Sequence, residues 1–357
     1  MRTSDSPFLD FQENLSAAHS RILIVEDVES IQLAIRDFLF SRYNVVSAPS
    51  AEDALTILSE DKDIDLLITD ISLPGMNGIE LGRLARKLNP TIKIILITSY
   101  DVNNYIQAIK EYEMTQVITK HGRMSLKEIS TAIEKMISGD IFGIQKYFPQ
   151  VQFVQIPWNA LPKHCISGTI YEIKISSLFQ RGKVTDDISA HLKARKKAPE
   201  STMKLVLDEI TSNAMFRAPV TDHGEFKYQT RHDDHDILIP ENDIILDEED
   251  SFTLQFGIID DWVVFACIDP HGRLTAKEIL FRLHRHIALD SKTGLPLGLR
   301  DSHGRGLFLL REHLSALVFN IQKNKKTELI CLYNLRTSQA YKNISIYEIE
   351  SNTDHKA

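Results

Sequence analysis

Short apolar runs alternate with amphipathic stretches through the first 140 residues. The runs are apolar at successive positions, as in strands that are buried on both faces. We predict five such strands, at 21–25, 43–46, 64–69, 92–97 and 116–119. The intervening stretches repeat apolar residues at i, i+3 and i+4, which predicts helices near 28–41, 51–60, 78–88, 101–112 and 125–138. Buried strands that alternate with helices indicate an α/β fold, a doubly wound five-stranded parallel sheet with helices on both faces.

The pattern changes in the second half, where strands follow one another in pairs. Asp260-Asp261 separates two apolar runs and is typical of a tight turn. We predict strands at 169–175, 252–259, 262–268, 318–322 and 328–333. Helices are expected near 178–196, 200–217, 274–287 and 306–317. This order predicts an α+β sandwich, mostly antiparallel, with its helices on one face.

These patterns divide the chain into five segments. A length of 357 residues is too great for one ordinary core and suggests two or three domains. The aromatic-rich connector is partly apolar, so we expect it to be packed. The predicted segments are a flexible leader at 1–20, the α/β domain at 21–139, the connector at 140–165, the second domain at 166–349 and a tail at 350–357.

Composition narrows the classes of function. Hydrophobic residues make up 43% and charged residues 25%, the balance of a soluble globular protein. A net charge of -8 and the lack of a recognition-helix motif argue against a DNA-binding regulator. The sequence contains no apolar stretch of about 20 residues, so we expect no membrane span. The first 20 residues are polar and do not resemble a signal peptide. Three cysteines without paired spacing fit a reducing compartment, so we expect a cytoplasmic protein.

Acidic residues follow two strands of the predicted parallel sheet. Glu26 and Asp27 follow the first strand, and Asp70 follows the third. The carboxyl ends of parallel strands meet at one edge, where ligands bind. Crowded carboxylates require a cation, and their oxygens suit Mg²⁺, which leaves one carboxylate able to attack phosphorus. An acidic pair that only stabilises a helix N-terminus is the alternative.

Two further strand ends carry groups that bind phosphoryl oxygens. Thr98-Ser99 ends the fourth strand and can donate a hydroxyl hydrogen bond, while Lys120 ends the fifth and can pair as an ammonium. Taken alone, a threonine or a lysine at a strand end is equally typical of an ordinary surface residue. Together with the acidic residues, in this order, they indicate a phosphoryl-accepting site.

The loop Asp70-Ile-Ser-Leu-Pro-Gly-Met-Asn-Gly78 resembles the phosphoacceptor loop of two-component response-regulator receivers, and the resemblance covers about residues 20–139. It implies that Asp70 is the phosphoacceptor and that Glu26 and Asp27 support Mg²⁺. It also implies that Thr98 is the switch hydroxyl and Lys120 the phosphoryl-pairing lysine. The implied partner is a cognate sensor histidine kinase or a phosphotransfer protein.

Two positions depart from that family pattern. His121 follows Lys120 where receivers usually carry proline, and Val117 stands where many carry a switching aromatic residue. Thr98 is retained, so we expect the phosphorylation chemistry to survive. The departures predict an unusual route by which the signal leaves the domain.

Candidate nucleotide ligands lie in the second half. Glu209 and Asn213 are four residues apart and share a helix face, where they could bind Mg²⁺ and water beside a nucleotide, with Glu209 as a base. Asp269 ends an apolar strand, and a buried carboxylate there needs a partner such as an adenine amino group. Gly304 and Gly306 directly precede a helix, whose N-terminus favours phosphate. A polar helix face and a turn at Asp269 remain alternatives.

The order of these motifs resembles the ATPase domain of the GHKL class. The motifs are Glu209-x-x-x-Asn213, Asp269-x-x-Gly272 and Gly304-Arg-Gly306, with Thr327 on a late strand. Histidine kinases, gyrase-type ATPases and anti-sigma-factor serine kinases share this domain, and the resemblance covers about residues 165–336. It implies that Asn213 holds Mg²⁺, Glu209 is the general base and Asp269 reads adenine. The Gly304–Gly306 loop would cover the phosphates, with Gly272 and Thr327 also in the ATP site.

The leading hypothesis is a response regulator whose phosphorylation controls an ATP-binding output domain. That domain would act as a serine/threonine kinase or sequestering factor on a partner such as an anti-sigma-factor antagonist. The alternative is a non-enzymatic binding module that keeps the fold. The connector is too short for a dimerisation hairpin, which argues against an autophosphorylating histidine kinase, although a homodimer stays open. The run 231–236 is read as a solvated loop rather than a metal cluster, and 193–197 as a basic helix end.

Overall fold

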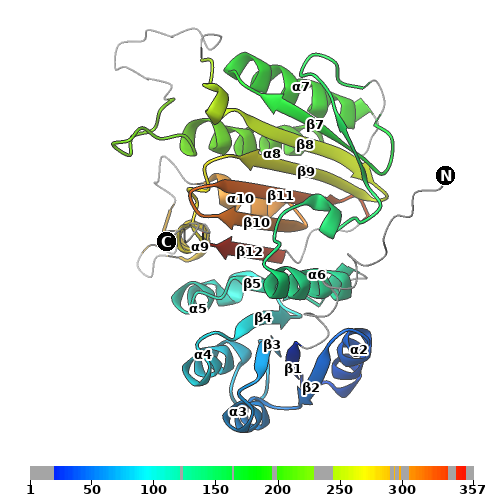
Figure 1. Cartoon of the computed structure of the whole chain (residues 1–357), viewed down its shortest axis with the longest axis vertical. Coiled ribbons are helices and arrows are strands. Elements are labelled where there is room, and N and C mark those ends of the chain that lie inside the picture. Colours follow the sequence, from blue (N-terminus) through cyan, green and yellow to red (C-terminus); the bar gives the residue numbers. More distant parts are fainter. Residues whose placement is uncertain are drawn as a thin grey trace, which may run out of the picture. The chain divides into compact units, whose positions relative to one another are not determined.

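The chain divides into two compact units (Figure 1). The first contains the described residues up to Ile141 together with Asn343–Ser345, and the second contains the described residues of 142–342 together with Ile346–Glu350. The computed structural model describes residues 20–120, 124–162, 165–194, 199–228, 244–289, 293, 297–298, 305–336 and 343–350. Among the described residues, no helix combines the length and the apolar character that crossing a membrane requires.

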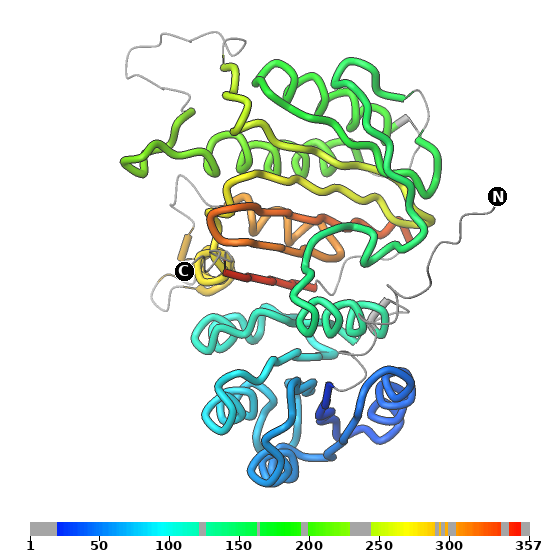
Figure 2. The backbone as a smooth tube through the Cα atoms, in the orientation of Figure 1, coloured from blue at the N-terminus to red at the C-terminus, as the bar shows by residue number. Residues whose placement is uncertain are grey.

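The first unit contains a parallel sheet with the strand order β2-β1-β3-β4-β5. Its strands are β1 (Arg21–Val25), β2 (Asn44–Ala48), β3 (Ile64–Asp70), β4 (Lys93–Thr98) and β5 (Gln116–Thr119). Its helices are α2 (Glu29–Leu39), α3 (Ala51–Glu60), α4 (Gly78–Leu88), α5 (Ile106–Glu111) and α6 (Met124–Ser138), with a 3-10 turn, η1 (Val102–Tyr105), before α5. The predicted α/β fold with parallel strands is confirmed. Figure 2 traces the backbone through this unit, with its beginning in blue.

Local sequence explains how these elements begin. The central strands are almost wholly buried, as their continuous apolar runs predicted. Helix α3 starts at Ser50, whose hydroxyl accepts from the Asp53 N–H at 3.1 Å. Helix α4 starts at Asn77, whose carboxamide oxygen accepts from the Glu80 N–H at 2.9 Å. These caps satisfy backbone donors that have no partner inside the helix.

A strand that the sequence analysis did not predict joins the first unit. The strand is β12 (Asn343–Ile349), and its first residues pair antiparallel with β5, with Ile344 opposite Val117 and Ser345 opposite Gln116. The signal for this strand was the apolar alternation Ile344, Ile346, where both side chains are buried. The sequence analysis predicted no strand after residue 333, so β12 is an element that it missed.

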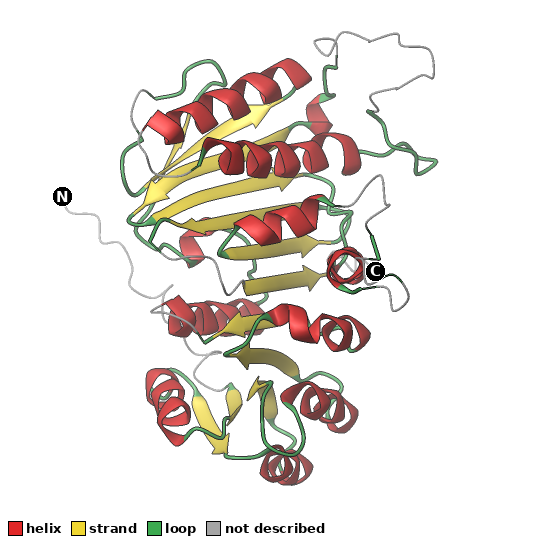
Figure 3. Ribbon diagram, turned by 180° about the vertical axis from the view of Figure 1, so that it is seen from behind, coloured by secondary structure: helices red, strands yellow, loops and turns green. Residues whose placement is uncertain are grey.

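The second unit is built on a largely antiparallel sheet with the order β10-β11-β9-β8-β7-β6. Its strands are β6 (Gln152–Gln155), β7 (Thr169–Ile175), β8 (Phe252–Ile259), β9 (Trp262–Asp269), β10 (Ala316–Gln322) and β11 (Lys326–Asn334). Its helices are α7 (Leu178–Ala194), α8 (Glu200–Ser212), α9 (Ala276–Ile287) and α10 (Gly306–His313), with short turns η2 (Ile144–Lys146) and η5 (Glu248–Asp250). Figure 3 shows helices lying against one face of these strands.

Two helices of the second unit end earlier than predicted. The helix expected to reach residue 317 ends at His313, because Ala316 pairs with Leu332 as the first residue of β10. The helix expected to reach residue 217 is α-helical only to Ser212 and continues as one π-helical turn, η3 (Asn213–Arg217). In that turn the Ala218 N–H bonds to the Asn213 carbonyl at 3.1 Å. Such single π turns are frequent at functional sites.

The connector carries structure that the sequence analysis did not predict. Strand β6 pairs in parallel with β7, and Ile144 of η2 is fully buried. The Gly143 N–H donates to the buried Glu328 carboxylate at 2.8 Å, and the same carboxylate accepts from the Asn320 amide at 2.7 Å. The start of the connector is therefore bonded to Glu328 of β11, which in turn accepts from Asn320 of β10.

Candidate functional site

Three carboxyl groups meet at the carboxyl edge of the parallel sheet in the first unit. β1 and β3 pair in register with Val25 opposite Thr69, which brings the residues that follow them together. Oxygens of Glu26, Asp27 and Asp70 lie within 4.8 Å of one another. Glu26 and Asp70 are buried, whereas Asp27 is exposed. The arrangement has the oxygen ligands and the open side that a partly hydrated Mg²⁺ requires.

Lys120 neutralises part of this charge. Its Nζ lies 2.6 Å from Asp70 Oδ2 and 2.7 Å from Glu26 Oε2. Burial raises the pKa of Glu26, and the hydrogen bond and charge of Lys120 oppose that rise. One ammonium faces two buried carboxylates and a third exposed one, so the pocket still favours a further cation.

The loop after β3 orients Asp70 through backbone and side-chain contacts. The Ser72 N–H donates to Asp70 Oδ1 at 3.1 Å, and the Ser72 hydroxyl lies 3.1 Å from the Tyr105 hydroxyl of η1. At the end of β4, the buried Thr98 hydroxyl accepts from the Tyr100 N–H at 3.0 Å. Sequence reasoning missed Ser72 and Tyr105, and a polar residue two positions after Asp70 was the signal available for the first.

Gly78 closes this loop against the backbone of Asp70. A Cβ at this position would overlap the Asp70 carbonyl oxygen and crowd the Thr69 hydroxyl. We therefore expect Gly78→Ala to destabilise the chain by about 1–3 kcal/mol, the usual cost of overpacking, as a lower thermal unfolding midpoint. Gly182→Ala is the matched control, because Gly182 lies in α7 with open space around it and should gain helix propensity. Equal effects of the two substitutions would contradict this reading of Gly78.

Comparison with known proteins identifies the first unit. Residues 22–134 match the family described as response regulator receiver domain. Sporulation initiation phosphotransferase F of Bacillus subtilis is 28% identical over 120 residues, which are 33% of this chain and 94% of that protein. Sensor kinase CckA of Brucella abortus is 27% identical over 143 residues, or 38% of this chain but only 15% of that protein. A receiver domain structure from Clostridium thermocellum is 28% identical and covers 34% of this chain and 95% of that chain, with a TM-score of 0.31.

Residues 22–134 are a response regulator receiver domain. Receiver domains accept a phosphoryl group on aspartate in two-component signalling, bind Mg²⁺ at an acidic pocket and interact with histidine kinases or phosphotransfer proteins. The match ends at residue 134 and does not reach the second unit. Of the two departures from the receiver pattern, Val117 is buried in β5 opposite Ile344, and His121 lies outside the described residues.

In the second unit, candidate residues from three separate segments line one cavity. This cavity has a volume of about 240 Å³ and is lined by Asn213, Asp269 and Thr327, together with apolar side chains of α8, β9, α10 and β11. A neighbouring cavity of about 570 Å³ is lined by Glu209, Asn213 and Gly306. Asn213 belongs to both linings, so it stands where the two cavities meet.

Asp269 lies at the inner wall of the smaller cavity. It is buried at the end of β9 and lies opposite Thr327 in the β9–β11 pairing. Its Oδ1 accepts from the His271 N–H at 2.9 Å and the Gly272 N–H at 3.3 Å. Burial raises the pKa of Asp269, and these backbone hydrogen bonds oppose the rise. Gly272 is thus a turn residue, with φ +59°, that holds the carboxylate and is not itself among the lining residues.

Glu209 and Asn213 contact each other on one face of the helix. The Asn213 amide donates to Glu209 Oε1 at 2.8 Å. The Glu209 carboxylate lies directly against Gly306, at the start of α10, where a Cβ would overlap it. The spacing of four residues predicted the first contact, whereas only the fold brings α10 to the same place. Gly304 and the run 231–236 lie outside the described residues.

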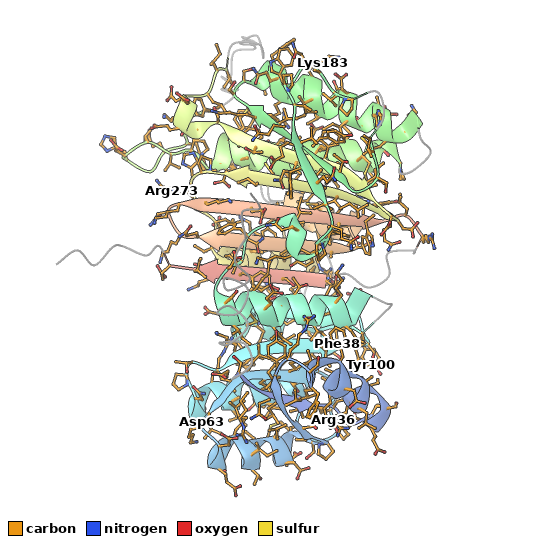
Figure 4. All side chains as sticks on the ribbon, turned by 45° about the vertical axis from the view of Figure 1, so that its right-hand side comes forward. Arg36, Phe38, Asp63, Tyr100, Lys183 and Arg273 are labelled. Atoms are coloured by element: carbon orange, nitrogen blue, oxygen red, sulfur yellow. The ribbon has the colours of Figure 1, made fainter. Side chains whose placement is uncertain are left out.

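Sequence reasoning did not single out the arginines of these cavities. Arg217 and Arg282 line both, Arg273 lines the smaller and Arg285 and Arg305 the larger. Arg217 lies over the Phe226 ring at 4.9 Å from its centroid. Figure 4 labels Arg273, just beyond the turn at Gly272. Arginine clusters suit anionic ligands because guanidinium groups pair with phosphate and carboxylate oxygens.

Proposed function

We propose that Asp70 is the phosphoacceptor of the receiver domain, with Glu26 and Asp27 beside it as Mg²⁺ ligands. The position of Asp70 supports this role, since it is held by Lys120 on one oxygen and by the Ser72 N–H on the other. When bound, Mg²⁺ supplies charge neutralisation for the incoming phosphoryl group. Lys120 then pairs with a phosphoryl oxygen, and the Thr98 hydroxyl donates to another.

We further propose that the second unit is a GHKL-type domain that binds ATP with Mg²⁺. The observation that supports this proposal best is the shared cavity lined by Asn213, Asp269 and Thr327, which come from segments more than 50 residues apart in sequence. Asp269 accepts the adenine amino group at the inner wall, beside Thr327. The triphosphate extends toward the larger cavity, where Asn213, Gly306 and the arginine side chains lie.

Within this site each side chain has a distinct role. Asn213 offers a carboxamide oxygen to Mg²⁺, since its amide nitrogen is already engaged by Glu209. Glu209 acts as the base that accepts a proton from the attacking hydroxyl. We propose that the output is a serine/threonine kinase or sequestering factor of the anti-sigma-factor type, with a regulatory protein such as an anti-sigma-factor antagonist as its partner.

Binding of a non-hydrolysable ATP analogue tests the nucleotide proposal. We expect the full chain to bind the analogue with Mg²⁺ and Asn213→Ala to lose about tenfold or more in affinity, since one lost charge-assisted contact contributes about 1.5–3 kcal/mol. Ser201→Ala, an exposed position on the same helix α8, is the control and should bind as the wild type does. Equal, negligible binding by the wild type and Asn213→Ala would overturn the ATP proposal. Binding without turnover or phosphoryl transfer would favour a non-enzymatic, phosphorylation-switched binding module.

A further inference from the structure

The side chain of Asn343 is bound to the receiver unit by three hydrogen bonds. Its Oδ1 accepts from both the backbone N–H and the hydroxyl of Thr119, each at 2.7 Å. Its amide nitrogen donates to the carboxylate of Glu128 on α6. The oxygen of this one carboxamide thus accepts from β5, and its nitrogen donates to α6. We call Thr119, Glu128 and Asn343 the carboxamide clasp.

Backbone pairing extends the clasp along β5. The next residue, Ile344, lies opposite Val117, and Ser345 lies opposite Gln116. Ile344 is buried, and so is Val117, where many receivers carry an aromatic residue. The small valine leaves the β5 edge able to accept an added strand. The edge of β5 is therefore a docking site, and the segment that occupies it is the chain's own Asn343–Ser345.

The clasp is adjacent to the phosphoryl-binding residues. Thr119 directly precedes Lys120, whose Nζ contacts Asp70 and Glu26. In the sheet, Thr119 is paired with Thr98 of β4, and the Lys120 N–H donates to the Thr98 carbonyl at 2.7 Å. Thr119 therefore lies between Thr98 on one side and Asn343 on the other.

We propose that the carboxamide clasp is a phosphorylation-sensitive latch: it holds Asn343–Ser345 on β5 while Asp70 is unmodified and releases this segment when Asp70 is phosphorylated. The proposal rests on the assignment of Asp70 as the phosphoacceptor. A phosphoryl group on Asp70 recruits both Lys120 and the Thr98 hydroxyl, which are the two neighbours of Thr119 in the chain and in the sheet. Lys120 therefore draws the end of β5 toward the acidic pocket, and Thr98 draws the paired end of β4.

Geometry decides the direction of the effect. Two donors of the same residue converge on a single oxygen at 2.7 Å, the short end of the range for the N–H donor and the commonest distance for the hydroxyl donor. A displacement of Thr119 toward the acidic pocket moves both donors away from Asn343 and lengthens or misaligns these bonds. Glu128 lies on a different element, α6, so it does not follow β5 and the two ends of the carboxamide are pulled apart.

Hydrogen exchange on the full chain tests the latch. Phosphorylation is produced with acetyl phosphate and Mg²⁺, and its extent is read from the intact mass of the same sample. Exchange is then followed in the peptide that spans 343–349 and at the Thr119 amide. We expect at least tenfold faster exchange in the phosphorylated chain. Asn343→Ala should exchange at the fast rate without phosphorylation, and Asp70→Asn should stay slow with the donor present.

The control is Asn104→Ala, at an exposed position of η1 in the same unit, and it should retain the wild-type response. If the phosphorylated chain exchanges at the unmodified rate or more slowly, the latch is overturned and the phosphoacceptor assignment stays intact. Absence of the added phosphoryl mass overturns both proposals. If Asn343→Ala folds poorly, Asn343→Asp keeps the size of the side chain but, at pH 8, sets a carboxylate against the ionised Glu128, and it should also exchange fast.

Discussion

Asp70→Asn is expected to reduce phosphoryl incorporation from acetyl phosphate to background. In the wild type, a carboxylate oxygen of Asp70 attacks phosphorus and acetate leaves, so the product is an aspartyl phosphate. A carboxamide keeps the shape of the side chain but has no nucleophilic oxygen of comparable strength. The intact mass of the full chain, measured after incubation with the donor and Mg²⁺, reports the result directly.

A second aspartate of the same unit provides the control for this experiment. Asp63 is exposed before β3, and Figure 4 labels it at the surface of this unit. Asp63→Asn should accept the phosphoryl group as the wild type does. Undiminished labelling of Asp70→Asn would show that another residue is the acceptor. The departure at position 121 leaves this expectation unchanged, because Lys120 Nζ and the Ser72 N–H both bond to Asp70 and the acidic neighbours lie within 4.8 Å of it.

Glu128→Gln should make the stability of the chain less dependent on pH. Burial raises the pKa of Glu128 from its ordinary value of 4.5 to about 7, even though the hydrogen bond from Asn343 opposes the rise. The folded protein then holds the proton more tightly than the unfolded chain does. Protonated Glu128 therefore stabilises the fold fully below about pH 4.5, and this stabilisation is lost as the pH rises through 7. A shift of this size corresponds to roughly 3 kcal/mol.

Urea unfolding of the full chain at pH 5 and pH 8 measures this effect. Glutamine is neutral at both pH values and can still accept a hydrogen bond from the Asn343 amide. We expect Glu128→Gln to match the wild type at pH 5 and to exceed its unfolding free energy by up to about 3 kcal/mol at pH 8. Glu134→Gln, an exposed position on the same helix, should follow the wild type at both pH values. A wild type as stable at pH 8 as at pH 5 would contradict the assignment.

The buried carboxyl of Glu128 is a member of the carboxamide clasp. A buried carboxyl is costly to keep ionised, and natural proteins retain such groups where they fix a particular partner. Here the partner is the Asn343 carboxamide, held between Glu128 and Thr119. The unusual exit route that the sequence predicted from Val117 and His121 thus has a physical candidate in the β5 edge.

The receiver fold and its acidic pocket could be predicted from the sequence because their determinants are local. Continuous apolar runs specify buried parallel strands, and residues directly after such strands necessarily meet at one edge of the sheet. Glu26, Asp70 and Lys120 are found together for that reason. The helical spacing of Glu209 and Asn213 likewise predicted their contact.

Contacts between segments distant in sequence were decided only by the tertiary structure. Strand β12 carries a weak alternating pattern, and nothing in that pattern names β5 as its neighbour, since pairing depends on which edge is open when the sheet is complete. The clasp joins Thr119 to a residue more than 200 positions away. The approach of Glu209 to Gly306 is of the same kind, because it arises from the packing of α8 against α10. Sequence alone determined which residues could do chemistry, and the fold decided which of them meet.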